Sequence, residues 1–407
     1  MSKPQRNTSA ELIESPTLAE LEADPHGVMR RYRAMTPVVR HEGLGYLVLR
    51  AEDIDGLTRP PRVRQVETEV ALLRGITDGA SFEFFAEGML TSNDEVHRSR
   101  RSPFTRTFAA RLIAELRPLL RRNAEDLIDA WKPAEEIDFV NRFAGLLPAQ
   151  AIAGLLGLPP QDIPRFTRLA YGASRLLSLS YAPEDQPDIE ADMSALKAYV
   201  EDLLADRRAE PRDDFLSAFL RDADQKGELS PLEIVVQIIV MIIGGTDTTR
   251  GAMAAQVALL LQHRNQWEMV CQDASLVPAA VTEALRYEPS VASISRVLQE
   301  EVSLDGLTLP AGQVVTLALI SALRDERVYQ MPDVFDIQRT DHPRLHPVFG
   351  GGPHRCIGEA LARAELEEGL AALTERVPGL EPVGEPFRLH GHWGIRRLGS
   401  MRVRRPH

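Results

Sequence analysis

The chain contains 407 residues, carries a formal net charge of −12 at pH 7 and has only two cysteines. The acidic balance excludes a typical nucleic-acid-binding protein, because such proteins expose a basic surface. The cysteine count excludes a disulfide framework and is typical of a reducing compartment. No linker, repeat or low-complexity block divides the sequence, although it is longer than most single domains. We therefore predict a polar N-terminal segment, residues 1–24, followed by one domain over residues 25–407.

The first residues of the chain do not form a signal peptide, because residues 1–15 are polar and lack an apolar core. The apolar run Ile234–Ile243 is shorter than the roughly 20 residues that cross a bilayer. The sequence therefore predicts a cytoplasmic protein without a membrane anchor.

Most of the chain has the pattern of a helical protein. Apolar residues recur with a period of 3.6 over residues 111–131 and 191–208, which predicts two long helices. Strand signals are few: Gly45–Leu49 is one, and Val302–Leu309 alternates around a central Asp305-Gly306 that is typical of a hairpin. The fold class is therefore mainly α with a small β region.

An almost wholly apolar stretch begins at Ile234 and ends in Gly244-Gly245-Thr246-Asp247-Thr248-Thr249. Such a helix is buried, yet each glycine costs roughly 1 kcal/mol in a helix interior, and a buried aspartate needs a partner. Thr248 lies four residues after Gly244, so its hydroxyl can bind the Gly244 carbonyl and open the helix locally. These departures from local rules indicate a functional site, although the string alone also fits an ordinary helix that ends at a glycine.

Glu283 and Arg286 are three residues apart and share a helix face. On its own this spacing indicates a solvent-exposed ion pair worth about 0.2–0.5 kcal/mol.

The most informative segment is the glycine-rich run from Phe349 to Glu359, which contains Cys356. A thiol near a helix N-terminus and beside Arg355 has a lowered pKa, so we expect an anionic sulfur that suits iron. A glycine at position 358 lets the next amide approach that sulfur closely. A small buried cysteine is the main alternative. A nucleotide loop fails because Arg355 replaces the third glycine of GxGxxG, and a zinc site fails because Cys271 is distant in the sequence.

Two motifs now carry a family resemblance. The pattern FxxGx[HR]xCxG is matched by Phe349, Gly352, His354, Cys356 and Gly358, and [AG]Gx[DE]T[TS] is matched by residues 244–249. The chain resembles the cytochrome P450 haem-thiolate monooxygenases over nearly everything from residue 25 to residue 403. The resemblance implies a triangular helical body that holds haem b between a proximal cysteine loop and a kinked distal helix.

The resemblance also assigns roles to residues. Cys356 would be the metal ligand, and Asp247 and Thr248 would be the catalytic pair that delivers protons to dioxygen. Further cofactor-binding residues, which hold the propionates, border the sulfur or make room for dioxygen, are His97, Arg101, Gly244, Arg296, Phe349, His354 and Gly358. Glu283, Arg286 and Arg339 would form a buried structural network.

The register with the family places a mostly apolar substrate pocket. Its walls would come from the loop before His97, a lid, the distal helix, the strand before Arg296 and a C-terminal turn: Phe82, Phe85, Met89, Leu177, Val240, Ile243, Ala292, Ile294 and Ile395.

These assignments predict a monooxygenase that hydroxylates a small hydrophobic or aromatic molecule with O2. No flavin or nicotinamide fingerprint is present, so NAD(P)H would act only through a ferredoxin and its reductase. Arginines near the motifs, among them Arg98, Arg100, Arg355 and Arg363, could form a positive face for this partner or be ordinary surface charges. We expect a monomer. A peroxide-driven enzyme, a coupling or rearrangement enzyme and a non-catalytic haem-thiolate sensor remain as alternatives.

Overall fold

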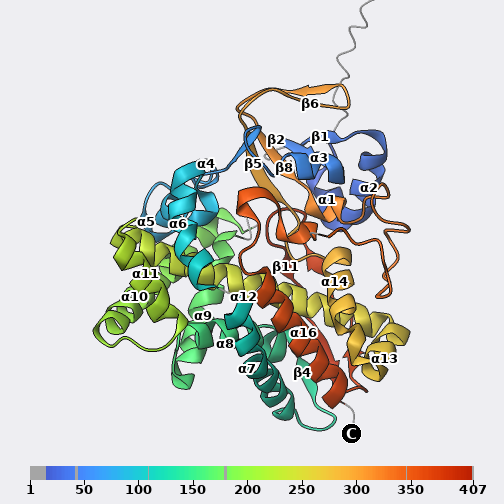
Figure 1. Cartoon of the computed structure of the whole chain (residues 1–407). Helices are drawn as coiled ribbons and strands as arrows, with labels where there is room; N and C mark the ends of the chain where they lie inside the picture. The colour runs from blue at the N-terminus through green and yellow to red at the C-terminus, as the bar shows by residue number, and fades with distance from the viewer. Residues whose placement is uncertain (1–14, 42–44, 109, 178–180, 345, 406–407) are drawn as a thin grey trace, which may run out of the picture.

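The computed structural model describes residues 15–41, 45–108, 110–177, 181–344 and 346–405. A large helical body surrounds one central helix, α12 (Pro231–Gln262), and a small sheet region with the first helices lies at one corner (Figure 1). This arrangement agrees with the predicted fold class.

The main sheet has five strands in the order β1-β2-β8-β5-β3. β2 and β8 are parallel, and the other neighbouring pairs are antiparallel. Its strands are β1 (Val38–His41), β2 (Gly45–Val48), β3 (Val63–Gln65), β5 (Ile294–Leu298) and β8 (Val314–Leu317). The strand predicted at Gly45–Leu49 is therefore β2.

Three smaller sheets complete the β region of the described residues. Their strands are β4 (Glu136–Asp138), β9 (Glu381–Val383) and β12 (Arg402–Arg404) in one sheet, β6 (Val302–Leu304) with β7 (Leu307–Leu309), and β10 (Leu389–His390) with β11 (Arg397–Leu398). Asp305 and Gly306 connect β6 to β7 with φ of 48° and 84°, the left-handed backbone of a two-residue hairpin turn. The predicted hairpin is confirmed.

The helices before α12 include both long helices that the periodicity predicts, α7 and α10. They are α1 (Leu18–Ala23), α2 (Pro25–Met35), α3 (Ala51–Gly56), α4 (Glu69–Leu73), α5 (Gly79–Glu87), α6 (Asp94–Thr107), α7 (Ala110–Asp129), α8 (Leu146–Leu155), α9 (Ile163–Ser174), α10 (Gln186–Ala209) and α11 (Phe215–Lys226). After α12 come α13 (Arg264–Gln272), α14 (Val277–Tyr287), α15 (Leu319–Ala322) and α16 (Glu359–Arg376). Leu21 in α1 is fully buried, so packed structure begins within the segment 1–24 that the sequence predicts to be polar.

The central helix α12 contributes its first half to one hydrophobic cluster and its second half to another. One cluster gathers residues of α5, α8, α9, α10 and α11, and the other gathers residues of α13, α14 and α16. The helix begins with Ser230 as N-cap, a capping box with Glu233 and Pro231 in the first turn. It remains one α-helix through Gly244 and Gly245.

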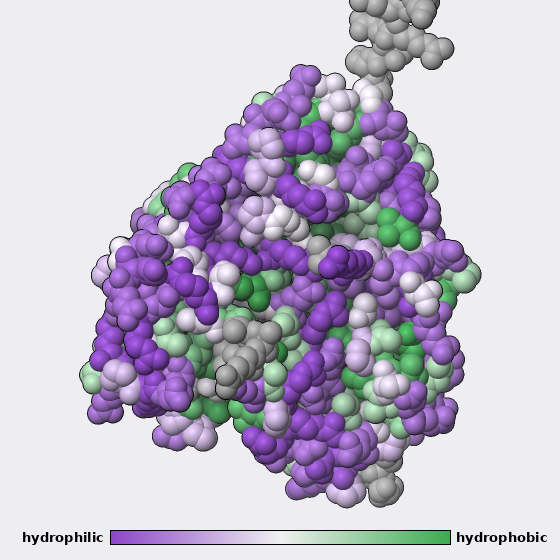
Figure 2. Space-filling model, viewed as in Figure 1, coloured by the Kyte–Doolittle hydropathy of each residue, from purple (hydrophilic) through white to green (hydrophobic). Residues whose placement is uncertain are grey.

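The membrane argument from the short apolar run needs a correction. α12 continues for 32 residues, so by length and composition this helix could cross a bilayer. However, 67% of its most apolar window is buried inside the fold, as expected of a core helix. The face shown in Figure 2 is mostly hydrophilic, with hydrophobic residues scattered in small groups.

Candidate active site

The cysteine loop is held by its own backbone and by the segment before β3. The Cys356 amide donates to the Phe349 carbonyl at 2.9 Å. Gly350 and Gly352 adopt φ of 70° and 62°, positive values that glycine adopts without strain. A Cβ on Gly352 would lie 2.4 Å from the Thr58 carbonyl oxygen, so only glycine fits there. The loop therefore has one tightly determined path into α16.

The Cys356 side chain is accessible at the end of this loop, although protein atoms surround it closely. Desolvation by the surrounding protein raises the pKa of the Cys356 thiol, although the Gly358 amide, Arg101 and Arg355 act in the opposite direction. The expectation of a lowered pKa is therefore wrong for the protein alone, because desolvation outweighs the Gly358 amide and the two arginines, and the Glu359 carboxylate also raises the pKa. A bound metal ion would deprotonate such a thiol outright.

A histidine of α6 packs against a histidine of the loop, with the two rings tilted by 35°. His97 in α6 and His354 lie with ring centroids 3.9 Å apart. Burial lowers the pKa of His97 to about 4 and that of His354 to about 3, so both imidazoles are neutral. The buried Nε2 atom of His97 has no hydrogen-bond partner. Arg101, one turn after His97, donates to the Arg355 carbonyl at 2.6 Å.

Arg296 in β5 is a buried cation. It is 3% exposed, and burial lowers its pKa to about 10. It donates to the Ser295 carbonyl at 2.8 Å, and no carboxylate of the described residues pairs with it. Burying a cation without a counter-charge costs free energy, so this position suits a bound anionic group. Arg296, Arg101 and the partnerless His97 Nε2 together fit the two propionates of a haem.

Two faces of α12 differ in their surroundings. A Cβ on Gly244 would meet no atom within 4 Å, so this position borders open space. The Thr248 hydroxyl donates to the Gly244 carbonyl at 2.8 Å, as the spacing predicts. Gly245 is different: a Cβ there would lie 2.6 Å from the Ile152 Cδ1 atom of α8. One glycine therefore provides space, and the next allows close helix packing.

Asp247 is buried and forms an ion pair with Arg250, one turn later in the same helix. Both residues line a polar cavity of about 650 Å³, together with Tyr171. The Tyr171 hydroxyl donates to the Gly145 carbonyl at 2.7 Å, and the Arg250 guanidinium lies 4.0 Å from the Tyr171 ring centroid. Sequence reasoning missed Arg250 and Tyr171. The i, i+3 spacing from Asp247 was the available signal for Arg250.

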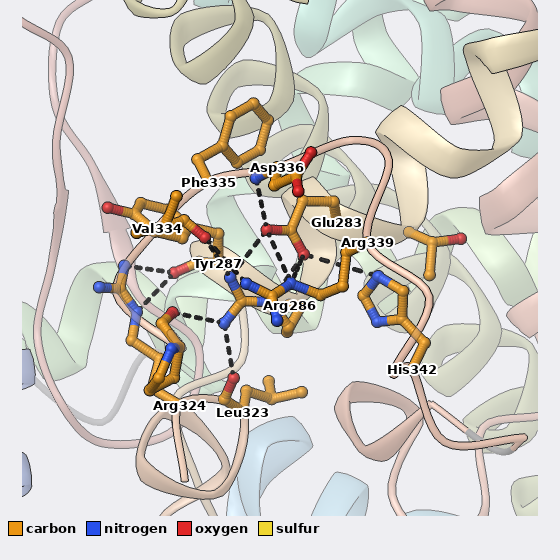
Figure 3. Close-up of polar contacts among 12 residues, drawn as sticks. Glu283, Arg286, Tyr287, Leu323, Arg324, Val334, Phe335, Asp336, Arg339 and His342 are labelled. Carbon is orange, nitrogen blue, oxygen red and sulfur yellow. Dashed lines mark hydrogen bonds and ion pairs between the residues drawn. The ribbon is translucent and has the colours of Figure 1, made fainter. Parts of the chain in front are cut away.

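Glu283, Arg286 and Arg339 converge in one buried network (Figure 3). Glu283 and Arg286 are both 0% exposed and are joined by two hydrogen bonds of 2.6 and 2.8 Å. Arg339 Nε lies 3.4 Å from the same carboxylate. The reading of Glu283 and Arg286 as a solvent-exposed pair is therefore wrong, whereas the network that the resemblance implies is present.

The network extends beyond the predicted trio. Arg286 also donates to the carbonyls of Leu323, Pro332 and Val334, and the Asp336 amide donates to Glu283. The Nε2 atom of His342 lies 3.5 Å from Glu283. These partners are largely backbone groups, which a sequence motif does not reveal. They connect α14 to the chain that leads toward the cysteine loop (Figure 3).

The predicted pocket residues separate into groups. Six of them belong to, or pack against, the cluster that includes the first half of α12: Phe82, Phe85, Met89, Leu177, Val240 and Ile243. Ala292 is buried in a different cluster with Leu21 of α1, and Ile294 packs against the sheet. Ile395 forms an isolated bridge with Val291. The structure thus brings together the pocket residues that precede or belong to α12, and it does not join the last three to that cluster.

The arginines that could have formed a positive face are mostly paired with carboxylates. Arg98 pairs with Glu95, and both Arg355 and Arg363 pair with Glu359. Arg100 is buried and pairs with Glu87 and Glu233. A strong positive surface built from these four residues is therefore not supported.

Comparisons with known proteins agree with this site. The family described as "Cytochrome P450" matches residues 178–376. The plant-inducible cytochrome P450-pinF1 of Rhizobium radiobacter is 43% identical over 95% of this chain and 92% of its own length. Luteothin monooxygenase of Streptomyces thioluteus is 32% identical over 84% of each protein.

Among solved structures, CxnD, a P450 enzyme for C–S bond formation in chuangxinmycin biosynthesis, has a TM-score of 0.86 and 30% identity over 98% of this chain and 99% of its own. Relatives at this identity span almost the whole chain. The protein therefore belongs to the cytochrome P450 family and is a haem-dependent monooxygenase.

Proposed function

We propose that this monooxygenase inserts one oxygen atom from O2 into a small hydrophobic or aromatic molecule, most simply by hydroxylation. The observation that carries the proposal is that two neighbouring parts of α12, Gly244 and Asp247, have different surroundings. Gly244 borders open space, whereas Asp247 lines a polar cavity. An acid that contacts a polar cavity and an alcohol beside open space can move protons from solvent to a reaction chamber.

The haem would be held by Cys356 at its iron and by Arg101, Arg296, His97 and His354 at its propionates. Haem supplies the iron that activates dioxygen, and a thiolate ligand favours cleavage of the O–O bond. The buried positive charge of Arg296, which has no carboxylate partner among the described residues, supports this assignment.

Proton movement would begin at Asp247. Its carboxylate lines the polar cavity and is held in place by the ion pair with Arg250. A proton that enters through the cavity would therefore reach Asp247 first. Thr248 would pass the proton on by accepting it at a free lone pair and turning its own O–H away from the Gly244 carbonyl, because a hydroxyl has one donor and two acceptor lone pairs.

The substrate would contact Phe85, Met89, Val240 and Ile243, which are apolar and belong to one cluster. Such a wall favours an apolar ligand and excludes water from the reaction. Ala292, Ile294 and Ile395 would contribute only if the ligand reaches beyond this cluster.

Electrons would come from separate redox proteins, for which we propose a ferredoxin and its reductase. The absence of any nicotinamide or flavin fingerprint in the sequence supports a separate donor. Because Arg98, Arg355 and Arg363 are already paired, recognition of this donor would depend less on unpaired charge than the sequence suggests. We also propose that the protein is a monomer in the cytoplasm.

A coupling reaction is the second candidate, because CxnD is described as an enzyme for C–S bond formation. Isotope labelling separates the candidates. Ligands would first be found by their shift of the ferric haem spectrum and then turned over under ¹⁸O₂. Product with one ¹⁸O atom supports the monooxygenase proposal. Product without added oxygen supports coupling, and label that enters only from H₂¹⁸O₂ supports a peroxide-driven enzyme.

A further inference from the structure

Gln237 is a polar residue inside the apolar Ile234–Ile243 stretch of α12, and it is 0% exposed. A buried amide is costly unless its hydrogen bonds are made. An apolar residue, such as its neighbours Val236 and Ile238, would fill this position without that cost. The partners of Gln237 therefore indicate why an amide stands there.

Two of its three hydrogen bonds reach another segment of the chain. The Gln237 Oε1 atom accepts from the Met89 amide at 2.7 Å, and Nε2 donates to the Glu87 carbonyl at 2.7 Å. Nε2 also donates to the Glu233 carbonyl in its own helix at 2.9 Å. The side chain thus holds both ends of the connection between α5 and the short helix Met89–Thr91.

This connection packs against α12 at Val240. A Cβ on Gly88 would lie 3.3 Å from Val240 Cγ2 and 2.5 Å from the Phe84 carbonyl oxygen. Val240 follows Gln237 by three residues and Gly244 follows it by seven, so all three share one helix face. The amide of Gln237 therefore lies one turn from the proposed substrate wall.

Arg100 of α6 supports the same connection from the other side. It is buried, its Nε donates to Glu233 at 2.9 Å, and its Nη1 donates to the Ala86 carbonyl at 3.0 Å. It also forms an ion pair with Glu87. Polar contacts to the backbone thus fix residues 86–89 to two helices, α6 and α12. The apolar side chains of Phe85 and Met89 take no part in these polar contacts.

We propose that Gln237 is a positioning residue that determines which ligands fit, because it holds Phe85 and Met89 at a fixed distance from Val240. This inference rests on the proposed function, in which these three side chains border the substrate. Loss of the amide would leave the iron ligand unchanged but would let the wall move.

The first test is hydrogen exchange of the haem-loaded protein. Gln237→Met keeps the length of the side chain and removes all three hydrogen bonds. Amides within residues 86–91 should then exchange at least about tenfold faster, since loss of the contact removes their protection. Gln256→Met is the matched control, because Gln256 lies in the same helix, is 1% exposed and donates to Leu366 in a different cluster. It should leave exchange of residues 86–91 unchanged.

The second test compares imidazole with 4-phenylimidazole, whose nitrogen binds ferric haem iron and which differ by one apolar group. The ratio of their dissociation constants, read from the haem spectrum, should change about tenfold in Gln237→Met, which corresponds to about 1.4 kcal/mol. It should not change in Gln256→Met. If Gln237→Met does not fold, Gln237→Asn shortens the side chain and serves instead.

The outcomes separate the two proposals. Unchanged exchange in residues 86–91, an unchanged ratio, or equal effects in both variants would overturn the role of Gln237. Wild-type protein that binds neither azole would instead contradict the proposed function, because it would lack a ligand pocket over the haem.

Discussion

Asp247 and Thr248 are neighbours in sequence, but their side chains have different surroundings. Asp247 is paired with Arg250 at a polar cavity, and Thr248 is bonded to the Gly244 carbonyl beside open space. Adjacent helical residues point about 100° apart, so one helix can separate an acid from an alcohol. The proposed relay depends on both residues.

Thr248→Ala tests the alcohol. Without the hydroxyl, proton delivery should fail, and product formed per electron should fall by roughly tenfold or more, with hydrogen peroxide released instead. Product, peroxide and reductant consumption would be measured together. Thr248→Ser keeps the hydroxyl and should retain most coupling. Fully coupled turnover by the alanine variant would refute the relay.

At the scale of elements, α12 depends on two glycines that have different functions. Gly245 lies against α8, whereas Gly244 borders open space. We expect Gly245→Val to destabilise the protein by about 1–3 kcal/mol, because the buried Ile152 must move. Gly244→Ala should preserve or slightly raise stability, by up to about 1 kcal/mol, since alanine favours the helix. Urea unfolding measures both variants, and equal losses would contradict the distinction.

α14 is joined to the segment that leads to the cysteine loop by Glu283 and Arg286. Glu283→Gln leaves a buried arginine without its charged partner, which should cost about 3–5 kcal/mol and lower the amount of haem-loaded protein. Haem absorbance per protein and urea unfolding would be measured. Glu268→Gln removes an exposed pair with Arg264 and should cost less than about 1 kcal/mol. Normal haem loading of Glu283→Gln would contradict a bracing role.

At the scale of the whole molecule, the partly buried Glu288 joins the two ends of the chain. It pairs with His26 of α2 and with Arg396 near the C-terminus. Burial alone would raise the pKa of Glu288, but Arg396, His26 and Arg324 together hold it well below its ordinary value of 4.5. Burial lowers the pKa of His26 below 6.5.

Both shifts have the same consequence for acid stability. Each group binds a proton more readily in the unfolded chain, so stability falls as pH drops below 6.5 for His26 and below 4.5 for Glu288. Glu288→Gln should lower stability at pH 7 and flatten its decline below pH 4.5. Unfolding free energies from about pH 2 to about pH 8 would show this. The control Glu268→Gln removes an exposed carboxylate and should leave the decline unchanged. An identical pH dependence for Glu288→Gln would contradict the assignment.

The parts of the molecule that short motifs determine could be predicted. The Asp305-Gly306 hairpin and the Thr248 hydrogen bond each follow from local spacing. Contacts between distant segments could not. Arg100 appears as a surface charge in sequence, but Glu233, 133 residues away, makes it a buried partner. The pKa of Cys356 also depends on surrounding protein that the motif does not contain.

The central claim is that Cys356 binds haem iron as a thiolate. The most direct measurement is the absorption spectrum of the reduced, CO-bound protein, compared with Cys356→Ser. Wild-type protein should show the long-wavelength Soret band of a thiolate-ligated haem, and the variant should lose it. A wild-type spectrum typical of imidazole ligation, or an unchanged band in the variant, would contradict the account.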